Sequence, residues 1–159
     1  QEGKLRDVKV RVVFGDTGTG KTSAALDGLR RLGSVCRVTH WGSAGTFDGY
    51  DGQASLILDE FNGQPPIEEL LTWLDVFPVT LNARYRARQA MFVRVVLCSN
   101  SAPWTWYRYA PKAQRAALAR RLHLVEQWSG SWDNVTMTEV PASEVVRRMT
   151  ADPPGKLGK

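Results

Sequence analysis

The stretch GDTGTGKT combines a glycine-rich turn with a lysine and a threonine. Gly15, Gly20, Lys21 and Thr22 have the spacing of a phosphate-binding loop. In such a loop the glycines let backbone N–H groups point at phosphate oxygens, the lysine reaches the β- and γ-phosphates, and the threonine ligates Mg²⁺. The pattern predicts a site for ATP and Mg²⁺. The residues expected to hold the nucleotide are Gly15, Asp16, Thr17, Gly18, Thr19, Gly20, Lys21, Thr22 and Ser23.

Two acids, Asp59 and Glu60, end the apolar stretch SLILDE. Asp59 has the placement of a Walker B carboxylate, which holds Mg²⁺ through water together with Thr22. Glu60 suits a base that orients a water for attack on the γ-phosphate. The alternative is a solvated strand end. The pair favours ATP hydrolysis over nucleotide binding alone.

Asn100 ends the apolar stretch RVVLCSN. Its amide would lie near the γ-phosphate and position the attacking water, although Ser-Asn also makes a good turn or helix cap. Three aromatic residues follow, Trp104, Trp106 and Tyr107. They could stack on nucleic-acid bases, but packing beneath the loop is the preferred interpretation.

Arg120 and Arg121 end an Ala-rich segment just before another apolar stretch. One interpretation is an arginine finger, which neutralises transition-state charge in the ATP site of a neighbouring subunit. The other is a pair of helix C-terminal cations favoured by the helix dipole. The first interpretation requires the protein to work as a ring.

Basic residues concentrate in the middle of the chain. The fifty residues from Val76 to Val125 include nine Lys or Arg and no Asp or Glu. This bias predicts a polyanionic partner, because ordinary solvated surfaces mix both signs. Arg84, Arg86 and Arg88 would project from one face of an extended strand and grip a DNA backbone. A charged edge strand protected from aggregation is the alternative.

Apolar stretches alternate with helical patterns along the chain. Expected strands span residues 8–15, 35–40, 55–60, 94–100 and 122–128, and expected helices span 21–32, 65–74 and 111–121. This alternation predicts an α/β fold with a parallel sheet and helices on both faces, interrupted by an extended, hairpin-like basic segment. Functional loops of such sheets gather at the carboxyl ends of the strands, so the three polar signals should meet.

Composition sets the remaining limits. Apolar residues make up 43% and charged residues 23% of 159 residues, as in soluble globular proteins. No apolar run could cross a membrane, and Cys36 and Cys98 are expected to be buried and reduced. Residues 1–150 are expected to form one domain and 151–159 a disordered tail. Because the chain begins with Gln1, we expect a piece of a longer protein.

Several stretches together resemble the superfamily 3 helicase domain of the replication initiator (Rep) proteins of circular single-stranded DNA viruses, the circovirus and geminivirus group. They are GDTGTGKT, FDGYDGQ, LILDEFNG, LLTWLDVFPVTL, VVLCSN, SNSAPWTWY and ARRL. The similarity covers roughly Val8 to Trp128.

The resemblance implies a P-loop AAA+ fold with a five-stranded sheet of order 5-1-4-3-2, an inserted basic β-hairpin and a hexameric ring. It implies ATP at subunit interfaces, 3′-to-5′ movement on single-stranded DNA and a place in the host nucleus. In this family the Walker A residues correspond to Gly15, Gly20, Lys21 and Thr22, the Walker B acids to Asp59 and Glu60, and motif C to Asn100. The pore-hairpin basic residue falls nearest Arg84, and the arginine finger falls on Arg121, with Arg120 second.

The chain departs from the family in two respects. No glycine occurs between Thr80 and Arg94, where members carry a Lys-Gly turn, so the arginine that contacts DNA stays open. Complete initiators also have an N-terminal nicking domain with a His-x-His motif, which this chain lacks. We therefore expect an ATP-driven DNA helicase motor that does not nick DNA. Two alternatives remain: a nucleotide-gated DNA-binding and oligomerisation module that is inactive in isolation, and a small-molecule kinase.

Overall fold

The computed structural model describes residues 5–41, 45–81, 83 and 88–153. Six strands form one sheet in the order β2-β3-β6-β1-β7-β8. Their bounds are β1 Lys9–Gly15, β2 Val35–Val38, β3 Ser55–Leu58, β6 Arg94–Ser99, β7 Leu124–Ser131 and β8 Asn134–Glu139. The five strands β2, β3, β6, β1 and β7 run parallel to one another, and β8 is antiparallel to β7. The expected α/β class with a mostly parallel sheet is confirmed. Counted in chain order, the parallel strands lie in the order 2-3-4-1-5.

The central strands are apolar because both of their faces are covered. Every residue of β3 is buried, and so are Val10, Val12 and Val13 of β1. Such strands leave little room for polar side chains along their length. Polar residues are therefore displaced to the strand ends, where the candidate site lies.

One helix covers the first face of the sheet. Helix α1 (Lys21–Arg30) packs Ala25, Leu26 and Leu29 against sheet residues that include Val13 and Ile57. Because α1 begins directly at Lys21, the phosphate-loop sequence is held between the end of β1 and the first turn of this helix.

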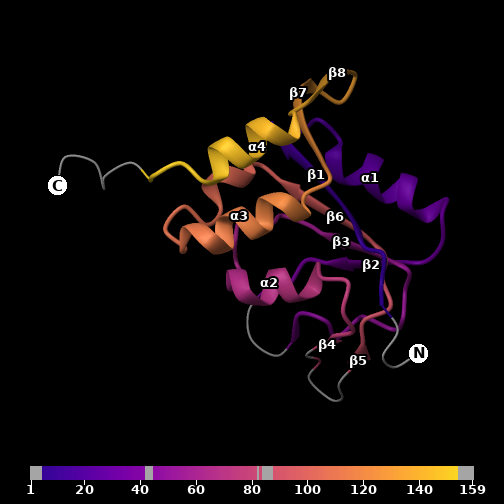
Figure 1. The fold of residues 1–159 in the computed structure, drawn as a ribbon. Coiled ribbons are helices and arrows are strands. Elements are labelled where there is room, and N and C mark those ends of the chain that lie inside the picture. Colours follow the sequence, from indigo (N-terminus) through magenta and orange to yellow (C-terminus); the bar gives the residue numbers. More distant parts are fainter. Residues whose placement is uncertain (1–4, 42–44, 82, 84–87, 154–159) are drawn as a thin grey trace.

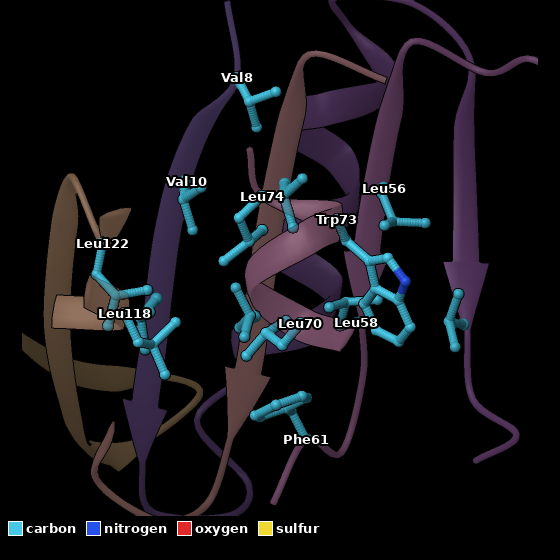
Figure 2. Packing of buried hydrophobic residues seen from close by; sticks show 14 of the residues in the cluster. Val8, Val10, Leu56, Leu58, Phe61, Leu70, Trp73, Leu74, Leu118 and Leu122 are labelled. Carbon is cyan, nitrogen blue, oxygen red and sulfur yellow. The ribbon is translucent and has the colours of Figure 1, made fainter. Parts of the chain in front are cut away.

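Three helices cover the other face (Figure 1). They are α2 (Ile67–Trp73), α3 (Lys112–Arg121) and α4 (Ala142–Met149). Figure 2 shows Leu70 and Trp73 of α2 over sheet residues such as Leu58, and all belong to one buried cluster. The prediction of helices on both faces is confirmed. No helix in the described parts of the chain is long and apolar enough to cross a membrane.

A separate two-stranded antiparallel sheet joins β4 (Thr80–Leu81) to β5 (Arg88–Gln89). Arg84 and Arg86 lie outside the described residues; with Arg88 they are the three arginines predicted to project from one strand face, called the arginine comb below. Arg88, the third, forms an ion pair with Asp51 at 3.4 Å. Tyr50 supports the same region, because its buried hydroxyl accepts a hydrogen bond from Met91 N at 2.8 Å. The loop FDGYDGQ therefore packs beneath this small sheet.

Strand β8, helix α4 and the short 3-10 helix η2 (Pro103–Thr105) were not expected from the sequence. In β8, Val135 and Met137 alternate with threonines, but the strand is almost wholly exposed and these two are its only apolar residues, so its signal is weak. The tail expected from residue 151 also has packed neighbours at its start. Arg115 donates to Ala151 O at 2.8 Å, and Pro153 is buried. Residues 154–159 lie outside the described part, and their disorder stays a prediction.

Both cysteines are buried and outside any disulfide. Burial raises the pKa of each thiol to about 11. They are packing residues at neutral pH, because the reactive thiolate is scarce there.

Candidate nucleotide site

A cavity of about 260 Å³ opens at the carboxyl ends of β1, β3 and β6. It brings together the three polar signals that sequence analysis expected to meet. Its lining residues are Thr17, Gly18, Gly20, Lys21, Thr22, Ser23, Arg37, Asp59, Glu60, Cys98, Ser99 and Asn100. Gly15, Asp16 and Thr19 belong to the same loop but do not line the cavity.

The loop between β1 and α1 depends on glycine at its start. Gly15 has a φ of +139°, and a Cβ there would meet Trp128 O of β7 at 1.9 Å. Asp16 N donates to the same carbonyl at 3.1 Å, which holds the loop against β7. Gly20 has a φ of +80°, a conformation that side chains disfavour, immediately before α1. The backbone can therefore curl toward the cavity only with these residue types.

Lys21 lies across the loop and reaches Asn100. Its Nζ donates to Asp16 O at 2.7 Å, Gly15 O at 3.3 Å and Asn100 Oδ1 at 3.2 Å. Burial lowers the pKa of the ammonium, while negative charges nearby, including Asp16 and Asp59, oppose that shift. The structure thus joins two residues that are 79 positions apart in the sequence.

Thr22 and Asp59 also meet, as a shared metal site requires. Thr22 Oγ1 donates to Asp59 Oδ1 at 2.9 Å, and the same oxygen accepts from Glu60 N at 2.9 Å. Asp59 is buried, since only 5% of its side chain is exposed. Its backbone is fixed too, because Trp41 Nε1 donates to Asp59 O at 3.1 Å.

Arg37 is a site residue that sequence analysis missed. It extends from β2, next to β3, and its guanidinium contacts Asp59 Oδ2 through Nε at 3.0 Å and the terminal NH2 group at 2.6 Å. Together with Thr22, it occupies both carboxylate oxygens of Asp59. The only signal in the sequence is a single basic residue inside the apolar strand VCRV.

Glu60 has an unusual backbone conformation, with a φ of +51°. Glu60 O accepts a hydrogen bond from Gln64 Nε2 at 2.7 Å, and Phe61 N donates to Cys98 O at 2.8 Å. These bonds turn the chain sharply at the end of β3. The exposed Glu60 side chain lines the cavity while Phe61 enters the core.

Phe61 also joins the segments that follow β3 and β6. Its ring lies 4.7 Å from that of Trp106, whose Nε1 donates to Ser99 Oγ at 3.2 Å. Tyr107 packs nearby and donates to Pro65 O at 2.7 Å. The prediction that these aromatics pack beneath the loop is confirmed, because Trp106 is buried in the core cluster and Trp104 and Tyr107 pack against it. Trp104 is half-buried, and the Arg148 guanidinium lies over its ring, 4.7 Å from the ring centre, as in a cation–π contact.

Arg120 and Arg121 lie at the far end of α3, where the chain enters β7, and neither lines the cavity. Arg121 forms an ion pair with Asp75 at 3.4 Å and is half-buried, whereas Arg120 is exposed. Neither residue can therefore serve the cavity of its own subunit. A finger role for either requires a second subunit and stays a prediction.

The donor set fits a nucleotide with Mg²⁺. Thr22 Oγ1 and the Asp59 carboxylate supply the hard oxygen ligands that Mg²⁺ takes, and the backbone curl and Lys21 suit phosphate oxygens. Within the described residues, no group of three or more His, Cys, Asp or Glu side chains could hold a metal ion. A cation here would hence complete its shell with phosphate and water oxygens, as Mg²⁺ does at phosphoryl-transfer sites.

Comparison with known proteins gives relatives of one kind. The chain is 30% identical over 161 residues to the replication-associated protein of Porcine circovirus 1, covering 98% of this chain and 48% of that protein. It is 27% identical over 158 residues to the replication-associated protein of Porcine circovirus 2, covering 96% of this chain and 47% of that one. The chain is related to the replication-associated proteins of circular single-stranded DNA viruses.

Another relative of this Rep-related chain is the replication-associated protein of Beak and feather disease virus, which is 31% identical over 105 residues, 65% of this chain and 34% of that protein. No protein-family model matches the chain. The chain spans about half the length of the two porcine circovirus proteins. Each of these relatives is named a replication-associated protein.

The Arg37–Asp59 pair leads to a stability prediction. Replacing Arg37 with Gln should lower the free energy of unfolding of the nucleotide-free protein by about 1–2 kcal/mol, since it removes the charged partner of a buried carboxylate. Mg²⁺ with ATP should remove most of this difference, because the cation becomes the partner of Asp59. Denaturant unfolding with and without the ligands measures both effects. Arg30→Gln, on the exposed end of α1, is the control, and an equal loss under both conditions would contradict the prediction.

Proposed function

We propose that this domain is an ATP-driven DNA helicase motor of a viral replication initiator. It hydrolyses ATP at subunit interfaces, moves along single-stranded DNA and unwinds duplex DNA during rolling-circle replication. The observation that carries the proposal is the convergence of Lys21, Thr22, Asp59, Glu60 and Asn100 around one cavity. The order of the parallel strands, 2-3-4-1-5, supports the AAA+ arrangement that the resemblance implied.

Each polar group has a task in hydrolysis. Lys21, which now bonds to backbone carbonyls and Asn100, would turn to the β- and γ-phosphates. Mg²⁺, held by Thr22 with the help of Asp59, would neutralise phosphate charge. Glu60 would accept a proton from the attacking water, and Asn100 would fix that water in line with the γ-phosphate. The positive φ of Glu60 matters because it turns this carboxylate into the cavity while Phe61 is buried.

The subunit arrangement follows from the arginines. Arg120 and Arg121 are remote from their own cavity, so a finger role needs a ring in which α3 of one subunit faces the cavity of the next. Arg120 is exposed and ready for such a contact, whereas Arg121 would first leave Asp75. Arg120 and Arg121 are therefore equally good candidates for the arginine finger.

The expected polyanion is single-stranded DNA, gripped by the basic segment between β4 and β5. Arg88 is the one member of the comb within the described residues, and its pair with Asp51 ties the segment to the loop FDGYDGQ. Arg84, which corresponds most nearly to the pore-hairpin basic residue of the family, and Arg86 are the other candidates for direct DNA contact. The salt dependence of binding would report the number of phosphates contacted.

A second candidate function is a binding module that needs further segments to form a ring. This candidate is supported by the length of the chain, which matches only about half of each porcine circovirus protein. A small-molecule kinase has less support, because it leaves Glu60 and the acid-free basic region without a purpose.

One experiment separates these functions: the ATPase rate per subunit measured against protein concentration, with and without single-stranded DNA. A ring motor should show a rate per subunit that rises with concentration and increases several-fold with DNA, because the finger arrives only on assembly. A negligible rate at every concentration, with DNA binding intact, would favour the binding module. Concentration-independent ADP formation that needs a small acceptor would favour a kinase.

A further inference from the structure

Trp132 is the most exposed large apolar side chain among the described residues, at 78%. It lies in the two-residue turn between β7 and β8, where Ser131 pairs with Asn134. The turn is ordered by its own contacts, since Ser131 Oγ donates to Asp133 Oδ1 at 2.7 Å. A single exposed tryptophan needs no explanation by itself. Trp132, however, lies beside the phosphate loop, and this position suggests a role in binding.

The β7–β8 hairpin is fixed to the phosphate loop at several points. Strands β1 and β7 pair up to Gly15 and Trp128, and Gly130 N donates to Asp16 Oδ2 at 3.3 Å. A Cβ built on Gly20 would lie 3.9 Å from Trp132 Cβ. The indole is therefore carried to the point where the loop enters α1. Figure 1 shows β7 and β8 on this side of the sheet, next to the end of β1.

The cavity gives a bound nucleotide a direction. Asp59, Glu60 and Asn100, the groups suited to the γ-phosphate, follow β3 and β6, which lie on one side of β1. Strands β7 and β8 lie on the other side. A triphosphate whose terminal phosphate meets Asn100 therefore has its α-phosphate and nucleoside on the side of Gly20 and the β7–β8 turn.

The described lining of the cavity includes no aromatic side chain. The cavity thus provides for phosphates and a cation but gives a base nothing to stack on. Trp132 supplies a large π-face at the end of the loop where the nucleoside emerges.

We propose that Trp132 is the stacking platform for the nucleobase of the bound nucleoside triphosphate. The inference rests on the proposed function, because it assumes a nucleotide in this cavity. The indole face covers one side of the base, and the other side stays open to solvent or to a neighbouring subunit. A platform of this kind binds by ring overlap and tolerates different bases.

Titration calorimetry with Mg²⁺ and either ATP or inorganic tripolyphosphate tests the platform. Tripolyphosphate has the phosphates but no base. Trp132→Ala should weaken ATP binding on the order of tenfold and leave tripolyphosphate binding unchanged. Trp132→Phe should keep most of the ATP affinity. Phe77→Ala, which removes another exposed aromatic whose backbone oxygen contacts Arg6 just before the start of β1, should change neither.

The possible results distinguish failure of the nucleotide site from failure of the Trp132 platform. Wild-type protein that binds neither ligand would refute the nucleotide site and the platform together. Wild-type protein that binds both, with Trp132→Ala weakening both equally or neither, would refute the platform alone. Unchanged ATP binding with weaker binding of single-stranded DNA would also overturn it and assign Trp132 to DNA.

Discussion

Lys21→Ala protein should hydrolyse ATP at least about 100-fold more slowly than wild type, which is the loss typical for removing one preorganised donor from a phosphoryl or oxyanion site. Lys21 is buried at the start of α1, and its Nζ donates to Gly15 O, Asp16 O and Asn100 Oδ1. No other Lys or Arg side chain is within hydrogen-bond distance of Asn100 among the described contacts. Steady-state ATPase assays with saturating Mg²⁺ and ATP measure the effect.

The control for this variant is Lys9→Ala. Lys9 is an exposed lysine that forms an ion pair with Asp7, and it lies at the opposite end of β1. A fully active Lys21→Ala protein would refute the nucleotide site. Equal losses for both variants would point to a general effect of removing positive charge.

The same variant tests the ring. Lys21→Ala subunits keep their arginine fingers, and subunits with both Arg120→Ala and Arg121→Ala keep their phosphate loops. Mixing the two inactive proteins should restore partial activity, because some interfaces then combine an intact loop with an intact finger. Absence of recovery would argue against a finger supplied between subunits.

Glu60→Gln protein should bind ATP with near wild-type affinity and hydrolyse it about 100- to 10,000-fold more slowly, the range for removing a general base. Gln matches Glu in shape, so the hydrogen bond from Gln64 Nε2 to the backbone oxygen of residue 60 and the turn at this position should persist. Single-turnover hydrolysis measures the rate, and calorimetry with Mg²⁺ and ATP measures binding.

Glu139→Gln is the matched control, because Glu139 is an exposed acid at the end of β8. Loss of binding together with hydrolysis would show that Glu60 supports the site rather than acting as a base. Hydrolysis at the wild-type rate would remove Glu60 from the mechanism.

Much of the site follows from local sequence. The loop from Gly15 to Thr22 has fixed spacing, and Asp59, Glu60 and Asn100 each follow an apolar strand directly. Parallel strands place their carboxyl ends at one edge, so these groups had to meet once the fold class was known. The contacts of Lys21 with Asn100 and of Thr22 with Asp59 agree with that argument.

Other parts depend on which strands become neighbours. Arg37 reaches Asp59 only because β2 pairs with β3, a pairing that no pattern within VCRV encodes. Trp132 lies beside Gly20 because β7 turns back into β8, through a turn that lacks the glycine of the strongest hairpin signals. Arg121 binds Asp75 because α3 ends near the segment after α2. These contacts are tertiary, so their partners are invisible to local periodicity.

The packing of Phe61 against Trp106 has a mechanical consequence. A Cβ at Gly63 would meet Trp106 O at 2.6 Å, so the segment after Glu60 is pressed against the segment after Asn100 without spare volume. The two segments form a single stiff unit, and a displacement at one is transmitted to the other and on to α2, whose Leu70 lies in the same buried cluster. A shift of Asn100, when Lys21 turns from it to the phosphates, would therefore be passed through this unit to the helical layer that covers the sheet.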